Sequence, residues 1–313
     1  MHYLVTGGAG FIGTHLVQCL LRGGHKVTVL DDLSTGKRES VPVSARFLAG
    51  DIRDSAQVVD AMHGVDGVFH LAAVASVRRS IENWKSVHEI NLTGFINVLD
   101  AARRMGRLPV IYASSAAVYG LSGQLPLRED ALPAPMSPYG ADKLGCEAHA
   151  QAATAVFGLP TVGLRFFNVY GPGQDPHSQY SGVISIFAGQ AIAELKIVIV
   201  GDGLQTRDFI YVSDVVDCLV KAMKNHASAP KVLNVCTGRT TNLLELAAAI
   251  ERVWDVRLEI SHAAERVGDI RSSCGSSELV IKSLDLGAGT TLLEGLSELR
   301  AAQVRAKTIA AAH

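Results

Sequence analysis

The first residues that could do chemistry form a glycine-rich segment near the start of the chain. Gly7, Gly10 and Gly13 recur every three residues, after an apolar run at 2–5 and before an apolar-periodic stretch at 11–22. Glycines at this spacing permit a tight turn, close approach of backbone to a pyrophosphate, and close packing of a helix on a strand. The following helix would offer its amides and dipole to the phosphates. We therefore expect a dinucleotide site, with a ligand-free strand–turn–helix as the alternative.

Two carboxylates follow at the end of the next apolar run. Asp31 lies 18 residues beyond Gly13 (31 − 13), where a carboxylate can accept hydrogen bonds from an adenosine ribose and would repel a 2′-phosphate. This position favours NAD over NADP. Asp32 is adjacent, so an aspartate here could instead cap a helix or loop. The nearby basic residues Lys37 and Arg38 leave NADP open.

A tyrosine and a lysine four residues apart form a second candidate group. Tyr139 and Lys143 lie at the start of a predicted helix, after Ser137-Pro138. The spacing puts both side chains on one helix face, ~5–6 Å apart at Cβ. An ammonium near a phenol favours the phenolate, so the pair could act as an acid/base near neutral pH. The pattern is common by chance, and its weight comes from its place downstream of the glycine-rich segment.

The hydrophobic pattern predicts the scaffold that positions these residues. Short apolar runs alternate with amphipathic stretches through the first half of the chain, which is typical of βαβ units and a parallel, doubly wound sheet. After residue 164 the rhythm breaks at Gly171-Pro172-Gly173. The chain is expected to leave the sheet near Phe166, return near Tyr211 and leave again after Cys236. Strands are expected at 2–5, 26–30, 46–48, 67–70, 109–113, 209–212 and 232–235, and helices at 11–22, 55–62, 83–105, 139–157, 213–224 and 301–313.

The composition limits the classes of protein to which the chain can belong. Its 313 residues are 48% hydrophobic, enough for a sizeable core, and 29 Lys and Arg against 30 Asp and Glu give a formal net charge of -1. A near-neutral chain has no global field to gather nucleic acid or an anionic membrane, so neither partner is expected. No apolar run reaches the ~20 residues of a spanning helix, and no secretory signal is visible. The five cysteines are scattered without a CxxC pair, so we expect a cytoplasmic protein with reduced thiols and no metal site.

Further motifs follow the glycine-rich segment in order along the chain. They are His70-Leu71-Ala72-Ala73, Ser114-Ser115-Ala116-Ala117-Val118-Tyr119-Gly120, Tyr139-Gly140-Ala141-Asp142-Lys143, Leu164-Arg165-Phe166-Phe167-Asn168-Val169-Tyr170-Gly171, Arg207-Asp208-Phe209-Ile210-Tyr211-Val212 and Arg266-Val267-Gly268-Asp269. With these motifs the chain resembles the NAD-dependent epimerase/dehydratase family of extended short-chain dehydrogenases/reductases, most closely its UDP-glucose 4-epimerase branch, over residues 1 to about 300.

This resemblance implies an α/β fold of the Rossmann type, a doubly wound parallel sheet with a smaller, discontinuous C-terminal lobe. The NAD-binding domain is expected at 1–165 plus 212–235. The nucleotide-sugar-binding lobe is expected at 166–211 plus 236–313. The helices at 83–105 and 139–157 resemble the pair that forms an intersubunit four-helix bundle in this family, so a homodimer is expected. Packing of these helices on the protein's own sheet is the alternative.

The resemblance also implies roles around the cofactor. Asp51 and Ile52 would touch the adenine, Leu71 to Ala75 would line the path to the nicotinamide, and Asn91 would brace the catalytic helix. Tyr139 would be the acid/base, and Lys143 would hold the nicotinamide ribose and tune the tyrosine. The full set expected at NAD is Gly7, Gly10, Phe11, Ile12, Gly13, Asp31, Asp32, Asp51, Ile52, Leu71, Ala72, Ala73, Ala75, Asn91, Tyr139, Lys143 and Phe166.

A UDP-sugar substrate is expected next to NAD. Ser115 follows the predicted strand 109–113, at the edge of the sheet where ligands bind, and would bond the sugar oxygen that loses its proton; a turn or cap role is the alternative. The diphosphate would be held by arginine forks, although each arginine alone could form a surface ion pair. The implied residues are Asn168, Arg207 and Arg266 at the diphosphate, Val183, Phe187, Ile199 and Gly201 at the base, and Asp269 at the ribose.

One further position bears on which sugar fits. In the epimerases that the chain resembles, the residue four past the aspartate of Arg-x-Gly-Asp borders the C2 substituent of the sugar, and here it is Ser273. A serine leaves room for an acetamido group, so substrates of the UDP-GlcNAc/UDP-GalNAc type are expected. The alternative is that Ser273 lies in a polar loop and affects no specificity.

The residues after Ser115 separate the reactions of the family. The dehydratases that the chain resembles carry Asp then Glu where it has Ala116 and Ala117, and related decarboxylases carry glutamate at the second position, so neither proton relay is present. We therefore expect a UDP-hexose or UDP-N-acetylhexosamine 4-epimerase. Tyr139 would take the C4 hydroxyl proton while hydride moves to bound NAD, and hydride would return to the other face of the 4-keto sugar. An NADPH-dependent reductase, a non-catalytic NAD(H) sensor, and dTDP in place of UDP stay open.

Overall fold

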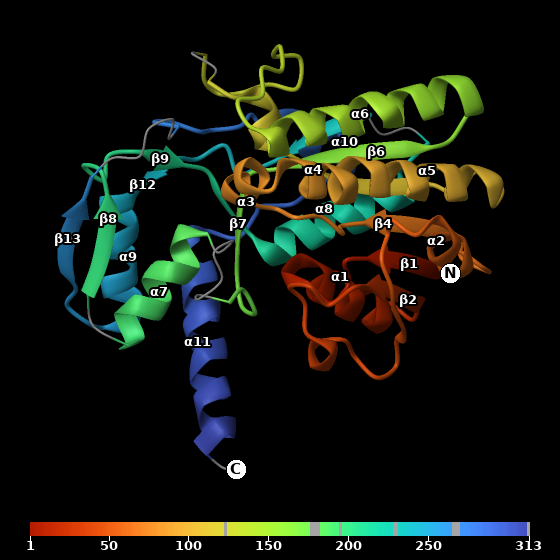
Figure 1. Cartoon of the computed structure of the whole chain (residues 1–313). Coiled ribbons are helices and arrows are strands. Elements are labelled where there is room, and N and C mark those ends of the chain that lie inside the picture. The colour runs from red at the N-terminus through yellow and green to blue at the C-terminus, as the bar shows by residue number, and fades with distance from the viewer. Residues whose placement is uncertain (122–123, 176–181, 194–195, 228–230, 265–269, 312–313) are drawn as a thin grey trace.

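A seven-stranded parallel sheet forms the centre of the computed structural model, which describes residues 1–121, 124–175, 182–193, 196–227, 231–264 and 270–311 (Figure 1). The strand order is β11-β6-β5-β4-β1-β2-β3, and every pairing is parallel. The expected doubly wound α/β fold is confirmed. The strands are β1 (His2–Thr6), β2 (Lys26–Asp31), β3 (Arg46–Ala49), β4 (Gly67–His70), β5 (Val110–Ser115), β6 (Thr161–Phe166) and β11 (Val232–Val235).

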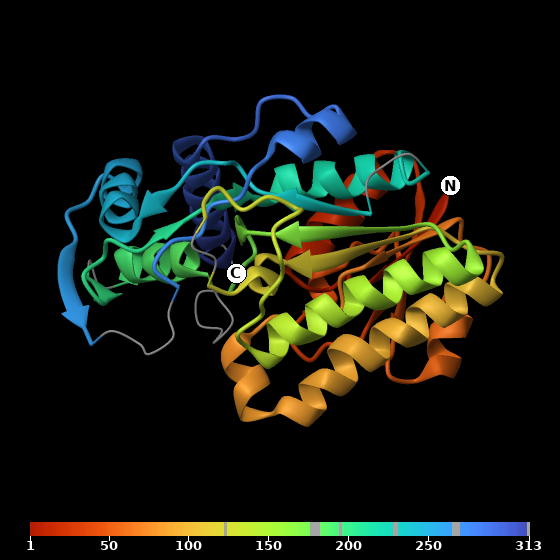
Figure 2. The ribbon, with the colours of Figure 1, turned by 90° about the horizontal axis from the view of Figure 1, so that it is seen from above.

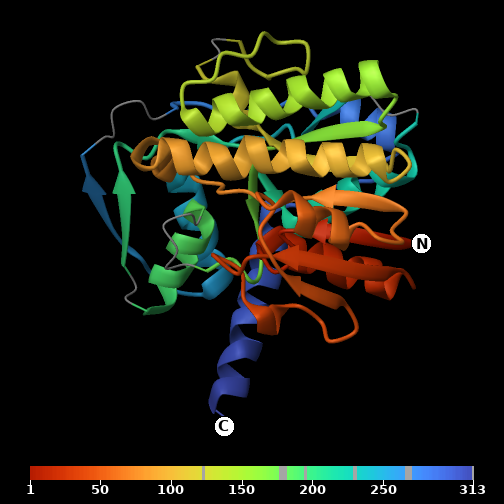
Figure 3. The same cartoon turned by 45° about the vertical axis from the view of Figure 1, so that its right-hand side comes forward.

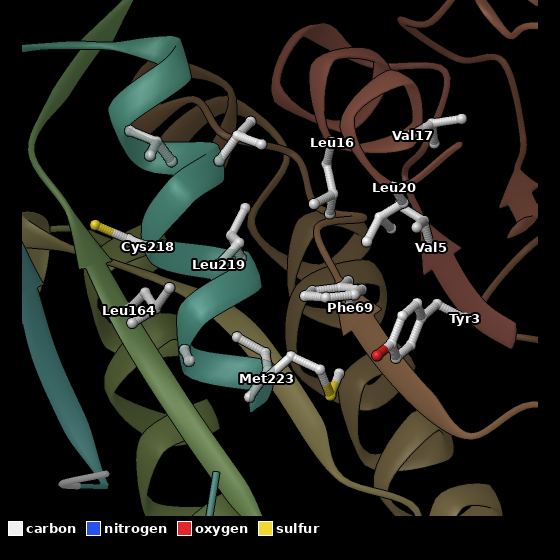
Figure 4. Packing of buried hydrophobic residues seen from close by; sticks show 14 of the residues in the cluster. Tyr3, Val5, Leu16, Val17, Leu20, Phe69, Leu164, Cys218, Leu219 and Met223 are labelled. Atoms are coloured by element: carbon white, nitrogen blue, oxygen red, sulfur yellow. The ribbon is translucent and has the colours of Figure 1, made fainter. Parts of the chain in front are cut away.

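Helices cover both faces of this sheet. Alternate strand residues point to opposite faces, so Tyr3 and Val5 pack with one group of helices and Leu4 with the other. On the first face α1 (Phe11–Arg22) and α8 (Val212–Lys224) meet over Phe69 (Figure 4), together with α10 (Glu278–Leu284). The other face carries α2 (Ser55–Ala61), α5 (Gly94–Arg104) and α6 (Pro138–Phe157), and the last two lie side by side (Figures 2 and 3).

The helix predicted at 83–105 is divided in the structure. It consists of α4 (Trp84–His88), a π-helical turn η2 (Glu89–Thr93) and α5, with α3 (Val77–Glu82) immediately before it. A π turn is defined by its i→i+5 backbone hydrogen bonds, which the pattern of apolar residues does not report. Such turns are rare and are often found at functional sites.

A second group of elements packs around its own core beside the sheet (Figure 1). The elements are β7 (Asn168–Tyr170), α7 (Val183–Ala193), β8 (Lys196–Val200), β9 (Thr206–Arg207), β10 (Phe209–Tyr211), β12 (Thr241–Asn242), α9 (Leu243–Trp254), β13 (Glu259–Ala263) and α11 (Leu292–Ala311). The helix predicted at 301–313 is, over residues 301–311, the end of the longer helix α11.

The return of the chain near Tyr211 differs from the expectation. The predicted strand at 209–212 forms as β10, but it pairs with β7 in a separate two-stranded sheet. The chain rejoins the central sheet only with β11, through α8. Alternation of apolar residues marks a strand without marking its partner, which explains the error.

Along the described part of the chain, no helix combines the length and the apolar character needed to span a membrane.

Candidate functional site

A cavity of about 1410 Å³ lies at the carboxyl ends of the sheet strands. Its walls come from the segments that follow β1, β3 and β4 and from the ends of β2, β5 and β6. Doubly wound sheets bind their ligands at this edge. The residues named from sequence that line it are Gly7, Gly10, Phe11, Ile12, Gly13, Asp31, Asp32, Asp51, Ile52, Leu71, Ala72, Ala73, Ala75, Ser115, Tyr139, Lys143, Phe166, Asn168 and Val183.

The glycine-rich turn leaves no room for side chains on its inner side. A Cβ on Gly13 would lie 2.1 Å from the carbonyl oxygen of Gly7, and a Cβ on Gly7 would lie 2.6 Å from the amide nitrogen of Ala72. Gly7 has a φ of 71°, in the left-handed region. Gly10 caps α1 without a side-chain hydrogen bond, so the amides of the first turn can face the cavity. The turn is thus a backbone cradle of the kind that holds a diphosphate.

The second feature of this end of the cavity is Asp31, at the end of β2. Its carboxylate accepts hydrogen bonds from the amides of Ala9 and Leu33, each at 2.9 Å. Burial raises its pKa, and the two amides counter that effect. Each oxygen keeps a lone pair for a ligand hydroxyl. Of the two basic residues that left NADP open, Lys37 lines the cavity, whereas the guanidinium of Arg38 lies over the ring of Phe47 and donates to the Val41 carbonyl.

The pair Tyr139 and Lys143 lies at the start of α6 and also lines the cavity. Ser137 caps this helix, accepting from the amide of Gly140 at 3.1 Å. The Lys143 ammonium lies 5.9 Å from the centre of the Tyr139 ring and donates to the carbonyl of Ala113 at 2.8 Å. Lys143 is buried while Tyr139 is partly exposed to the cavity. The ammonium therefore lies near the phenol ring.

A serine that sequence reasoning missed supports the tyrosine. The buried hydroxyl of Ser80, in α3, accepts from the backbone amide of Tyr139 at 3.1 Å and donates to the carbonyl of Val77 at 2.6 Å. Ser80 precedes Tyr139 by 59 residues, and no local pattern links the two. Only the packing of α3 on α6 brings them together.

Ser115 ends β5 and lines the cavity. Its hydroxyl oxygen accepts from the amide of Ala117 at 3.1 Å and caps the 3-10 turn η3 (Ala116–Tyr119). The capping role considered from sequence is therefore real. Since the oxygen acts as acceptor in this contact, the hydroxyl hydrogen can still be donated to a ligand.

Asn91 lies behind the wall of the cavity. Its side chain accepts from the amide of Val74 at 2.8 Å and donates to the carbonyl of the same residue at 3.2 Å. The backbone carbonyl of Asn91 accepts a hydrogen bond from the thiol of Cys146 in α6. Asn91 thus braces both the Leu71–Ala75 segment and the helix of Tyr139. It could influence a cofactor through Val74, which lines the cavity.

The residues expected at the nucleotide base are not all on the wall of this cavity. Val183 lines it, but Phe187 and Ile199 are 2% and 0% exposed in the core of the second group of elements. Gly201 follows β8 with a φ of 78° and donates its amide to Ala263. Apolar residue type alone could not separate a ligand wall from a core, which is why sequence reasoning grouped them.

The residues expected at the diphosphate and the sugar gather only in part. Asn168 lines the cavity, whereas Arg207 and Ser273 do not. These two residues lie near each other, since both donate to the carbonyl of Thr206, at 2.9 and 3.1 Å. Arg266 and Asp269 lie outside the described residues.

The chain is similar to UDP-sugar 4-epimerases. The UDP-glucose 4-epimerase of Mycolicibacterium smegmatis is 38% identical over 257 residues, which are 80% of this chain and 82% of that protein. The crystal structure of the Thermotoga maritima UDP-glucose 4-epimerase with UDP-glucose matches with a TM-score of 0.93 and 33% identity, covering 99% of this chain and 100% of that one. The UDP-N-acetylglucosamine 4-epimerase of Methanobrevibacter ruminantium, in complex with UDP-N-acetylmuramic acid, matches with a TM-score of 0.93 and 32% identity, covering 97% and 98%.

Residues 3–236 match the model of the NAD dependent epimerase/dehydratase family. This match includes the glycine cradle, Asp31, Ser115 and the pair Tyr139 and Lys143. The resemblance inferred from the motifs is confirmed, and the chain belongs to the NAD dependent epimerase/dehydratase family.

Proposed function

We propose that this protein is an NAD-dependent 4-epimerase of UDP-hexoses or UDP-N-acetylhexosamines. The observation that carries the proposal is the presence of Ser115, Tyr139 and Lys143 on the wall of the same cavity as the glycine cradle. The names of the similar proteins support it, since they act on UDP-glucose and UDP-N-acetylglucosamine. At the positions after Ser115, Ala116 and Ala117 put methyl groups where a dehydratase would need an acid and a base.

The residues present fit NAD. The cradle at Gly7, Gly10 and Gly13 would receive the diphosphate, and Asp31 would accept from the adenosine ribose. Lys143, which has three N–H donors and uses one on Ala113, would hold the nicotinamide ribose. Bound in this way, NAD would supply a reversible acceptor for the hydride of the sugar C4.

The protein's own groups manage the proton. The Tyr139 oxygen would accept the proton of the C4 hydroxyl, and the Lys143 ammonium would stabilise the phenolate that must be ready for it. The Ser115 hydroxyl would donate to the same sugar oxygen and fix its position. After the keto sugar has turned over, Tyr139 would return the proton. The net change is stereochemical, so the enzyme would need no added cofactor.

Several finer assignments belong to the same proposal. We assign the NAD-binding domain to 1–165 plus 212–235 and the nucleotide-sugar lobe to 166–211 plus 236–313. Separate hydrophobic cores support this division, although α10, within 236–313, packs on the sheet of the NAD-binding domain. A homodimer through α5 and α6 is supported by a cavity of about 180 Å³ between these helices and by Val156, which is 72% exposed. All five cysteines are free thiols, which agrees with a cytoplasmic location.

The proposal is tested by following product stereochemistry. Wild-type protein is incubated with UDP-glucose and with UDP-GlcNAc, without added cofactor, and the C4 epimers are identified by NMR. In the variant Tyr139→Phe, turnover should fall by roughly 10²–10⁴-fold, because the acid/base is gone. Its circular dichroism and NAD content should match those of the wild type. Near wild-type turnover in this variant would remove the catalytic assignment.

A further inference from the structure

A row of polar side chains crosses three neighbouring strands beneath the reactive wall. Ser114 on β5 is directly opposite Arg165 on β6, and Arg165 is directly opposite Asn234 on β11. Their exposed fractions are only 2%, 4% and 0%. Buried polar groups in a sheet covered on both faces are costly unless each is paired. The row therefore needs partners from outside the sheet.

Glu147, on α6, supplies the main partner. One of its carboxylate oxygens accepts from the Ser114 hydroxyl at 2.5 Å and from Arg165 Nε at 2.8 Å, and the other accepts from Arg165 Nη2 at 2.7 Å. The pair is bidentate and its side chains are 5% and 7% exposed. A planar guanidinium fixes a carboxylate in one orientation better than a lysine could.

The far end of the network reaches the turn after Ser115. Arg165 Nη1 donates to the Tyr119 hydroxyl at 2.7 Å, and this hydroxyl donates to the Asn234 side chain at 2.6 Å. Asn234 in turn donates to the carbonyl of Leu127 at 2.9 Å. Since Tyr119 belongs to η3, the same network contacts the turn that Ser115 caps.

The position of Glu147 on α6 matches that of the proposed catalytic pair. Tyr139, Lys143 and Glu147 follow one another at intervals of four, so they lie on one face of the helix. Lys143 bonds Ala113, and Glu147 bonds Ser114, the next residue of β5. A carboxylate one turn from a lysine would ordinarily form an ion pair with it. Arg165 occupies both oxygens of Glu147 and so competes with that ion pair.

We propose that Glu147 and Arg165 are positioning residues that set the charge beside Lys143 and lock β5 to α6. This inference rests on the roles given to Tyr139 and Lys143 in the proposed function. Because the ion pair of Glu147 and Arg165 has no net charge, the Lys143 ammonium interacts with Tyr139 rather than with Glu147. The link through Ser114 keeps Ser115 in register with the phenol.

Other titratable groups surround the same helix and remain unchanged in the test. Burial lowers the pKa of His70 to about 3, with the Lys143 charge as the second cause, and burial raises the pKa values of Tyr112, Tyr119 and Cys146. Asp142 bonds His88, of α4, at 2.7 Å. Glu147 or Arg165 contributes to the pKa shifts of Tyr112, Tyr119 and Cys146, but burial keeps these three groups neutral where an activated phenol would ionise. Subtracting the matched Tyr139→Phe curve removes the absorbance of the other tyrosines.

The experiment is a direct titration of the Tyr139 phenol in the full-length protein without substrate. Absorbance of the phenolate is recorded against pH, and the curve of the same protein carrying Tyr139→Phe is subtracted. Glu147→Gln should lower the midpoint, because Arg165 then adds unbalanced positive charge. Arg165→Met should raise it, because Glu147 is released toward Lys143. Each shift should reach roughly one pH unit, the effect expected of one charge at about 12 Å, eight helical residues away, at an effective dielectric constant of about 20.

The double variant Glu147→Gln/Arg165→Met decides whether the shifts come from the charges of this pair. It removes both charges, so its midpoint should return to that of the wild type. Should Arg165→Met fail to fold, Glu147→Gln and the double variant still give a shift and its reversal. Asp208→Asn, at another buried carboxylate, controls for general destabilisation and should leave the midpoint unchanged.

Equal midpoints in the wild type and both single variants would overturn the proposal, as would a double variant that does not return to the wild-type value. A purely structural pair would lower stability without shifts of opposite sign. The titration needs no turnover. An inactive wild-type enzyme would therefore count against the proposed function while this test remains readable.

Discussion

Each reactive group on the cavity wall is held by a second residue. The Tyr139 amide is bonded to Ser80, the Lys143 ammonium to Ala113, and the Ser115 hydroxyl to the amide of Ala117. Groups that are fixed before the substrate binds lose little further freedom in the reaction. The site is thus preorganised by contacts that come from four different elements.

Acid should destabilise the protein through His70, which is fully buried beside Thr6. Burial, and then the Lys143 charge, lower its pKa from 6.5 to about 3 in the folded state. The unfolded chain therefore takes up a proton first, so the contribution of His70 to stability is complete above pH 6.5 and is lost as pH falls toward 3. The slope from this residue should reach about 1.4 kcal/mol per pH unit. Urea unfolding above and below pH 6.5 measures it.

The controls for this prediction are two substitutions of histidine. His70→Asn should flatten the dependence of unfolding free energy on pH, because the titrating group is gone. His63→Asn, at an exposed histidine, should leave the dependence unchanged. An unaltered slope in His70→Asn would show that other groups account for acid unfolding.

Substrate choice should respond to Ser273. Ser273→Tyr is expected to abolish turnover of UDP-GlcNAc and to spare UDP-glucose, because a ring excludes an acetamido group by a clash, whereas a loosely packed sugar loses only ~1–3 kcal/mol. Rates on both sugars are compared with those of Ser272→Tyr. Ser272 is the adjacent residue of an extended segment bridged to Thr206, and its side chain points the other way. Equal losses on both sugars in Ser273→Tyr would place the specificity elsewhere.

At the scale of elements, the conformation of the first βα turn requires glycines, because side chains there would meet backbone atoms. Gly13→Ala should remove bound NAD and lower the melting temperature, since the new methyl group meets the carbonyl of Gly7 at 2.1 Å. Overpacking against rigid backbone costs about 1–3 kcal/mol or more. Gly287→Ala is the matched control, because nothing lies within 4 Å of its Cβ. NAD content after purification and thermal unfolding are the measurements, and wild-type values in Gly13→Ala would refute the cradle.

Most elements could be predicted from the pattern of apolar residues, and the errors have physical causes. The predicted strands at 2–5, 26–30 and 109–113 end too early, because the strands finish in polar residues. Asp31 and Ser115 line the cavity, and Thr6 is buried and hydrogen-bonds His70. The division of the helix at 83–105 depends on η2, which is set by backbone hydrogen bonds that the apolar pattern does not report.

Site residues that belong to short sequence motifs could be predicted. Residues that reach the site through the packing of distant elements could not. Gly13, Asp31 and Tyr139 belong to short motifs, and all line the cavity. Ser80, Glu147 and Arg165 reach the site only through pairs of elements that no local pattern connects. The base pocket was predicted wrongly for a different reason. Apolar residues such as Phe187 and Ile199 can line a ligand site or fill a core, and here they fill a core.

At the scale of the whole molecule, the outer faces of α5 and α6 are the strongest candidate for an interface. The wild type should show the mass of two chains by light scattering at micromolar concentration. Val156→Asp should yield monomers, because a charge at a buried contact opposes association. Val43→Asp, at a site that is 98% exposed in another part of the surface, should not. A wild-type monomer under these conditions would exclude a stable dimer.

The buried carboxylate of Asp208 has a consequence for how the chain folds. It accepts from the amide and hydroxyl of Thr237 and from the amide of Gly238, 29 and 30 residues later, and from the amide of Gly275, 67 residues later. These partners leave the ribosome long after Asp208 does. Until they arrive, a charge that the native structure buries completely must stay in water. The segment around Gly275 is therefore required for the middle of the chain to fold, and a chain that stops before Gly275 should remain a substrate for chaperones and proteases.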